Sequence, residues 1–285
     1  MGLRVLTAAI LIPVVVALVW WGPPWLLAAI AAVIAILALA EFFTLGDRVG
    51  LRAFRKWTMA CTAGLFYAQY SAGAVEIRSV SFDIALVRRN VGVSLPLDAL
   101  LLIFIFGAVS IGLATRRPLQ EVLAAMAVSS AGLLFIALPF SYLVRIELIE
   151  RFGRELVLFT LVLIWAGDML AYFVGRFLGR VPMAPVLSPK KTWEGAFANL
   201  VASLLVGFLF ARWMGVEILG MLVIAALANI AGQMGDLIES AYKRGAAVKD
   251  SGGLLPGHGG VFDRVDSLIL GAPVVWALYS YFAHS

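Results

Sequence analysis

The sequence predicts an all-α fold, a polytopic integral membrane bundle of about nine transmembrane helices. Two observations predict it. Hydrophobic residues make up 62% of the 285 residues and charged residues only 14%, whereas about a quarter of a soluble domain is charged. The hydrophobic residues also form runs of roughly 20, the length that a helix needs to cross a bilayer. A soluble globular enzyme and a disordered chain are therefore excluded.

Short polar breaks separate the runs and set the expected helices. Pro23 and Pro24 end the first of them, because proline cannot continue a helix. Four polar residues make the third run the weakest: Thr58, Thr62, Gln69 and Ser71. We expect an outside loop or an amphipathic hairpin over residues 75–94. The expected spans are 3–22, 23–45, 56–74, 96–115, 122–143, 155–177, 193–213, 216–242 and 264–283.

The first run also resembles a signal peptide, since Arg4 precedes it. Tryptophans follow the run in place of a small-residue cleavage site, and tryptophan favours a membrane interface. We therefore expect a retained first helix.

The distribution of Lys and Arg predicts the orientation. With nine spans, the side that holds the N-terminus carries fifteen of the 22 basic residues and the other side seven. Cytoplasmic loops are the ones enriched in Lys and Arg. The N-terminus and the loops after the second, fourth, sixth and eighth spans are therefore expected in the cytoplasm, and the net charge of +5 requires no nucleic acid.

Ionisable groups within the spans are candidates for function, because lipid strongly disfavours them. Asp168 lies inside span 155–177, on a helix whose small residues Gly167, Ala171, Gly175 and Gly179 allow another helix to approach closely. The simpler alternative is a packing helix with one hydrogen-bonded aspartate. Span 216–242 carries a second polar stripe, which must line a cavity or meet another helix: Asn229, Gln233, Asp236, Glu239 and Ser240.

The segment 240–266 mixes glycines, cations and carboxylates. Glycines allow backbone N–H groups to approach an anion, and carboxylates are the ligands that Mg²⁺ prefers. Asp263 and Asp266 are three residues apart and would share one face of the last helix. His258 is a candidate donor to a phosphate. A solvated loop with surface ion pairs is the alternative.

A second loop on the same expected side, residues 187–195, carries adjacent lysines. Lys190 and Lys191 suit phosphate as point charges, and Ser188 or Thr192 would cap the helix that follows. A basic membrane flank with an interfacial Trp193 is the alternative.

Together these residues closely resemble the signature of the phosphatidate cytidylyltransferases (CDP-diacylglycerol synthases), most strongly over residues 160–270. Tyr242 stands where that signature has an aliphatic residue. The segments Ser188–Gly195 and Gly235–Asp236 also resemble the family. The matching signature residues are Ser240, Lys243, Arg244, Lys249, Asp250, Leu255, Pro256, His258, Gly259, Gly260, Asp263, Arg264 and Asp266.

The resemblance implies an enzyme that makes CDP-diacylglycerol and pyrophosphate from CTP and phosphatidic acid. It also implies Mg²⁺, allows a monovalent cation such as K⁺, and implies a homodimer among the lipids of the bacterial cytoplasmic (inner) membrane. Within a single membrane domain, residues 1–150 would serve packing and dimerisation, and residues 155–285 would carry the catalytic helices and cytoplasmic loops.

The residue roles that follow are expectations. The metal ligands would be Asp236, Asp263 and Asp266, with Asp168 and Glu239 near the metal or at the monovalent cation. The catalytic groups would be Arg244, Lys249, Asp250, His258 and Arg264. The phosphate-binding groups would be Ser188, Lys190, Lys191, Ser240, Lys243, Gly259 and Gly260.

Two other functions remain open at this point. A transporter would also place a polar stripe inside the membrane, in the sixth and eighth helices. A nucleotide-dependent lipid kinase would also bind phosphates and Mg²⁺. The sequence does not indicate acyl-chain preference, the order of substrate binding or the number of metal ions.

Overall fold

A computed structural model describes residues 2–81, 95–115, 117–253 and 259–284, and its description of side chains omits residues 2–10, 73–81 and 284. The described residues form nine continuous helices, one for each predicted span. The fifth contains a π-helical turn, η1 (Leu133–Ala137), between α6 (Leu119–Gly132) and α7 (Leu138–Glu147). The others are α1 (Gly2–Trp21), α2 (Pro24–Arg48), α3 (Arg55–Ser81), α5 (Leu97–Ala114), α8 (Gly153–Phe177), α9 (Trp193–Met214), α10 (Ile218–Gly245) and α11 (Phe262–His284).

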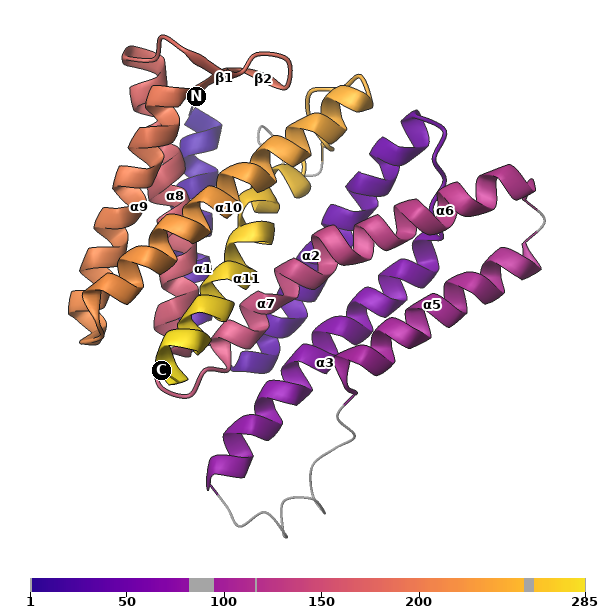
Figure 1. Ribbon diagram of the computed structural model, residues 1–285, viewed down its shortest axis with the longest axis horizontal. Helices are drawn as coiled ribbons and strands as arrows, with labels where there is room; N and C mark the ends of the chain where they lie inside the picture. Colours follow the sequence, from indigo (N-terminus) through magenta and orange to yellow (C-terminus); the bar gives the residue numbers. More distant parts are fainter. Residues whose placement is uncertain (1, 82–94, 116, 254–258, 285) are drawn as a thin grey trace. The chain divides into compact units, whose positions relative to one another are not determined.

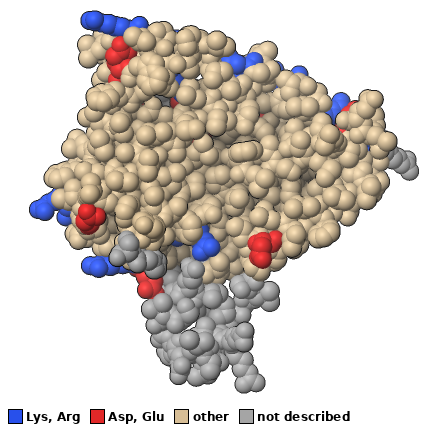
Figure 2. Space-filling view, viewed as in Figure 1, with Lys and Arg blue, Asp and Glu red and all other residues tan. Residues whose placement is uncertain are grey.

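Seven of these helices are long and apolar enough to cross a membrane. They are α2, α5, the α6–η1–α7 helix, α8, α9, α10 and α11; in α1 the apolar stretch Leu11–Trp21 is shorter. The face in Figure 2 is almost entirely uncharged, with a few Lys, Arg, Asp and Glu side chains near its margins. Exposed apolar side chains of this kind belong in lipid, so the all-α polytopic membrane fold is confirmed.

The chain divides into two compact units that interleave along the sequence. The first unit contains residues 1–153 and 251–262, and the second contains residues 154–250 and 263–285. In the first unit, α3 packs against α2, α5 and α7, and α3 and α5 run side by side in Figure 1. Its core includes the fully buried Leu39, Phe43, Leu65 and Leu133.

The polar residues that weaken the third span are satisfied inside the first unit. Thr58 and Thr62 each donate to the carbonyl four residues earlier, that of Phe54 just before α3 and that of Thr58 within it. Gln69 donates to Ser141 in α7 at 3.0 Å and accepts from Arg145 at 2.9 Å. A buried polar group with a partner carries little desolvation penalty, which is why α3 forms despite its composition.

The segment that follows differs from the expectation. Residues 75–81 continue α3 as helix, so the expected outside loop or hairpin was wrong for them. Residues 82–94 lie outside the described residues.

In the second unit, α9 and α10 pack against each other, and the hairpin of β1 (Pro182–Ala184) and β2 (Ser188–Thr192) precedes α9. A loop was expected here. Thr192 caps α9 by accepting from the Gly195 N–H at 3.2 Å, as its sequence position suggested. The hairpin therefore delivers Lys190 and Lys191 at a fixed distance from the start of α9.

Candidate active site

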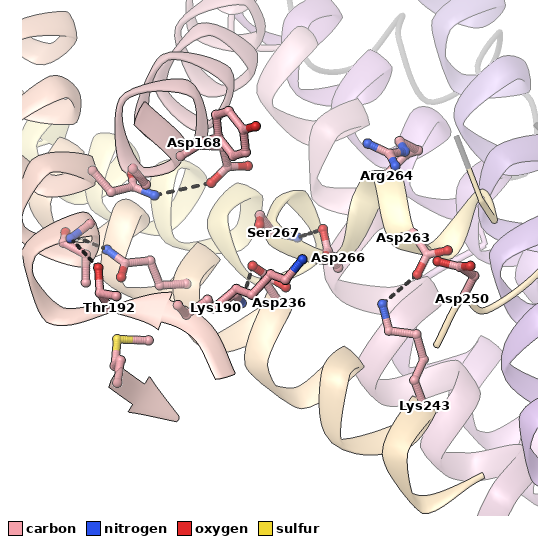
Figure 3. A pocket seen from close by; sticks show the side chains of 18 residues that line it. Asp168, Lys190, Thr192, Asp236, Lys243, Asp250, Asp263, Arg264, Asp266 and Ser267 are labelled. Carbon is pink, nitrogen blue, oxygen red and sulfur yellow. Dashed lines mark hydrogen bonds and ion pairs between the residues drawn. The ribbon is translucent and has the colours of Figure 1, made fainter. Parts of the chain in front are cut away.

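The second unit contains a cavity of about 450 Å³ with a charged lining (Figure 3). Five elements contribute to it: α8, the hairpin, α9, α10 and α11. The predicted site residues that line it are Asp168, Lys190, Lys191, Asp236, Lys243, Asp250, Asp263, Arg264 and Asp266. Residues as far apart in the sequence as Asp168 and Ser267 therefore share one cavity, and both signs of charge are present in it.

Three carboxylates converge beside this cavity, and two of them, Asp236 and Asp266, line it. Asp236, Glu239 and Asp266 each offer an oxygen, and the three oxygens lie within 4.8 Å of one another. Asp236 and Glu239 are adjacent on α10 at three-residue spacing, and Asp266 comes from the first turns of α11. Glu239 is only 1% exposed, and its Oε1 has no hydrogen-bond partner among the described residues. An unpartnered, buried carboxylate oxygen among other carboxylates is the donor set that a hard divalent cation takes.

Lys243 forms ion pairs with Glu239 of this cluster and with a fourth carboxylate, Asp263. Its ammonium lies 2.5 Å from Glu239 and 2.7 Å from Asp263. Asp263 was expected among the metal ligands, but it lies outside the three-carboxylate group and is paired with this lysine, as Figure 3 shows. Lys243 was expected at a phosphate. In this structure it neutralises two carboxylates that are almost completely buried.

Lys191 forms an ion pair with Asp236, so the hairpin reaches the acidic cluster directly. Lys190 beside it is exposed and also lines the cavity. In Figure 3 the Lys190 side chain extends close to Asp236 and Asp266. The basic loop and the polar stripe of α10 thus contribute to one site. From the sequence we expected only that this loop and the segment 240–266 lie on the same side of the membrane.

A chain of amides extends from the cavity into the helix bundle. Asn199 in α9 donates to Asp168 at 3.2 Å, and Asn229 in α10 donates to the Asn199 side chain and to Ser203 at 2.7 Å. Gln233 donates to the Asn229 oxygen at 2.7 Å. The polar stripe of α10 therefore meets another helix. Asn199 and Ser203 were missed in the sequence, although two polar residues four apart in an apolar span are the signal that singled out α10.

The small-residue ridge of α8 packs on the start of α9. A Cβ at Gly167 would overlap Asn199, and one at Gly195 would lie 3.0 Å from the Ala171 carbonyl and 3.4 Å from the Gly175 Cα. The close approach predicted from the spacing is confirmed. It allows the short Asn199 side chain to reach Asp168 across the interface.

We expect Gly167→Ala to destabilise the protein by about 1–3 kcal/mol, because the added methyl group displaces Asn199 in a packed interface. Thermal unfolding in detergent measures this. The matched control is Gly245→Ala at the end of α10, where a Cβ meets no atom within 4 Å, and its melting temperature should not fall. Equal melting temperatures for Gly167→Ala and the wild type would contradict the packing argument.

Several predicted site residues lie outside the cavity lining. Arg244 donates to the carbonyls of Leu187 at 3.1 Å and Val248 at 3.2 Å, so it joins the hairpin to the end of α10. Gly259 adopts a left-handed φ of 79°. His258 lies outside the described residues. The remaining ones are Ser188, Glu239, Ser240, Lys249 and Gly260.

The fold and the cavity together define a polytopic membrane protein whose helices enclose a site of carboxylates and lysines. The cytidylyltransferase family model matches residues 2–282, and the chain belongs to that family.

Curated relatives carry a more specific name. Over 152 residues the chain is 37% identical to a phosphatidate cytidylyltransferase of Bacillus subtilis, covering 53% of this chain and 56% of the relative. Over 135 residues it is 44% identical to one of Brucella abortus, covering 47% and 50%. Over 136 residues it is 41% identical to one of Haemophilus influenzae, covering 46% of each. The chain spans about half the length of the curated relatives it matches.

Proposed function

We propose that this protein is a phosphatidate cytidylyltransferase, which converts CTP and phosphatidic acid into CDP-diacylglycerol and pyrophosphate. The cluster of Asp236, Glu239 and Asp266, beside a cavity that is also lined by lysines, carries the proposal. The named relatives support the choice of substrates.

In the proposed reaction, a phosphatidate oxygen attacks the α-phosphorus of CTP. A new P–O bond forms, the bond between the α-phosphorus and the bridging oxygen breaks, and pyrophosphate leaves with the electron pair. Such a transfer depends on positioning and on stabilising the developing negative charge. Lys190, Lys191 and Arg264 line the cavity and would neutralise the phosphates. No serine or cysteine nucleophile is required.

The donor set fits Mg²⁺, because three carboxylate oxygens lie within 4.8 Å of one another and one buried Glu239 oxygen has no hydrogen-bond partner among the described residues. Asp236, Glu239 and Asp266 would hold the ion. When bound, Mg²⁺ neutralises phosphate oxygens and supports the departure of pyrophosphate. Asp168, held by Asn199, is proposed to sit beside the metal or at a monovalent cation such as K⁺. His258, Lys249 and Asp250 remain proposed as catalytic groups.

We further propose that the protein is a homodimer of the cytoplasmic (inner) membrane with its N-terminus and active-site loops in the cytoplasm. The excess of basic residues on that side supports this orientation. It gives the charged nucleotide access from the cytoplasm, while the acyl chains stay among the membrane lipids.

The test is product analysis with the purified protein, CTP, phosphatidate and Mg²⁺. We expect a CMP-bearing lipid and pyrophosphate, identified by mass spectrometry. With a polyprenol as acceptor, a monophosphorylated lipid and a nucleoside diphosphate would instead indicate a lipid kinase. Solute flux in sealed vesicles without consumption of CTP would indicate a transporter. Either of these results, without CDP-diacylglycerol, overturns the proposal.

A further inference from the structure

Glu41 is a buried carboxylate far from the cavity residues in sequence. It lies near the C-terminal end of α2, a helix that is otherwise almost entirely apolar up to that point, and only 5% of it is exposed. Nothing in the sequence distinguishes it from an ordinary interfacial charge. In the first unit, however, it is the contact point for a segment more than 200 residues away.

The Glu41 carboxylate binds both ends of the segment 251–262. At one end, the Ser251 hydroxyl donates to Oε2 at 2.9 Å. At the other end, the Val261 N–H donates to Oε1 at 3.0 Å and the Phe262 N–H donates to Oε2 at 2.8 Å. One side chain therefore bonds to both of the described ends of the segment.

Two glycines of the segment make this contact possible. A Cβ on Gly252 or on Gly260 would overlap the Glu41 carboxylate. Phe42, next to Glu41, packs edge-on against Phe262 with ring centroids 6.2 Å apart. Part of the glycine pattern that suggested phosphate binding is thus explained by the approach of this buried carboxylate.

The segment joins the two helices that carry the acidic cluster. Asp250 precedes Ser251 in the chain, and Phe262, the first residue of α11, is followed directly by Asp263 and Arg264. The Val261 and Phe262 N–H groups belong to the start of α11, where a negative charge is favourable. Because these two N–H groups are held by Glu41, the rotation of the first turn of α11 about its axis is set. That rotation determines the directions of the first side chains of α11.

We propose that Glu41 is a positioning residue for the transfer reaction. Its carboxylate sets the ends of the segment 251–262 and so orients the groups that immediately flank the segment. This inference rests on the proposed function. Glu41 itself makes no contact with substrate; it acts through Ser251, Val261 and Phe262.

The test compares Glu41→Gln, Glu41→Asp and the wild type in the purified full chain. The amide of Gln keeps one acceptor oxygen and turns an NH₂ group toward an N–H donor. We expect kcat to fall about 10–100-fold, the usual loss when a hydrogen-bonding residue that orients the groups of a site is changed. The KM for CTP should change less than threefold. Glu41→Asp keeps the charge and should recover part of kcat. The control is Asp47→Asn, an exposed acid on the same helix, which should keep wild-type kcat.

Hydrogen exchange of the intact protein gives a second measurement that needs no turnover. In Glu41→Gln we expect faster exchange in peptides that contain Val261 and Phe262, and unchanged exchange in α5. Ser251→Ala removes the hydrogen bond that the Ser251 hydroxyl donates to Glu41 and provides a milder variant if Glu41→Gln does not fold. We expect its kcat to fall about threefold to tenfold.

Three outcomes are distinguishable. An inactive wild type would reject the proposed function. An active wild type with full kcat and unchanged exchange in Glu41→Gln would reject the positioning role alone. In the third outcome, Glu41→Gln loses activity and exchanges faster throughout the protein, while Glu41→Asp recovers no kcat and Ser251→Ala loses none. That result would assign Glu41 to general stability and would also overturn the inference.

Discussion

We expect Asp236→Asn to lower the rate of CDP-diacylglycerol formation by about 100-fold to 1000-fold, the usual loss when one electrostatic contact to the reacting groups is removed. The amide preserves the shape of the side chain but removes a charged oxygen from the three-carboxylate cluster. It also leaves Lys191 without its ion-pair partner. The measurement is the initial rate as a function of Mg²⁺ concentration, with Asp47→Asn on the protein surface as the matched control.

The same titration separates the two possible sets of metal ligands. Asp266→Asn should raise the Mg²⁺ concentration needed for half-maximal rate, because Asp266 belongs to the cluster. Asp263→Asn should lower the rate without that shift, because Asp263 is paired with Lys243. If Asp263→Asn shifts the Mg²⁺ dependence as much as Asp236→Asn, the ligand set expected from the sequence is the right one. Full activity of Asp236→Asn would remove the basis for both sets.

The second large effect concerns stability. We expect Lys243→Met to destabilise the protein by about 3–5 kcal/mol, the range observed when one partner of a buried ion pair is removed. Lys243 is the cation between Glu239, which is 1% exposed, and Asp263, which is 7% exposed. Without it, two buried carboxylates face each other. Thermal unfolding in detergent measures the change, and Lys190→Met, at an exposed lysine, is the control.

A double variant tests the physical reason. If the loss comes from uncompensated charge, Lys243→Met combined with Glu239→Gln should be more stable than Lys243→Met alone, by more than 1 kcal/mol. If the two changes are additive, the loss comes from packing of the lysine stem, and the buried ion pair does not contribute as argued.

The helices were predictable because a membrane span carries its signal within a single run of residues. All nine predicted spans correspond to helices of the described chain. The third span shows the limit of an argument from composition. Thr58 and Thr62 make the run less apolar, yet each hydroxyl group donates to the backbone carbonyl four residues earlier. The hairpin at residues 182–192 was missed because its strands are three and five residues long and carry too few residues for a periodic pattern.

The types of residue in the site could be predicted from the sequence, but which side chains contact one another could be predicted only in part. Asp236 and Asp266 were expected near each other, and the structure brings them together with Glu239. The pairing of Asp263 with Lys243 depends on how α10 and α11 are rotated, which no spacing reveals. Asn199 and Ser203 were missed although their four-residue spacing was a signal, and that spacing does not reveal that Asn199 bonds to Asp168. Glu41 could not be identified at all, since its partners begin 210 residues later.

The interleaved course of the chain has a consequence for biosynthesis. The first unit includes residues 251–262, so the ribosome must synthesise the chain as far as Phe262 before that unit can be complete. Until then Glu41 is an acidic group at the end of a newly inserted helix without the three donors that satisfy it later. Truncated products that stop before α11 will therefore carry an incomplete first unit, with an acidic group that lacks its hydrogen-bond donors in an apolar environment that disfavours it.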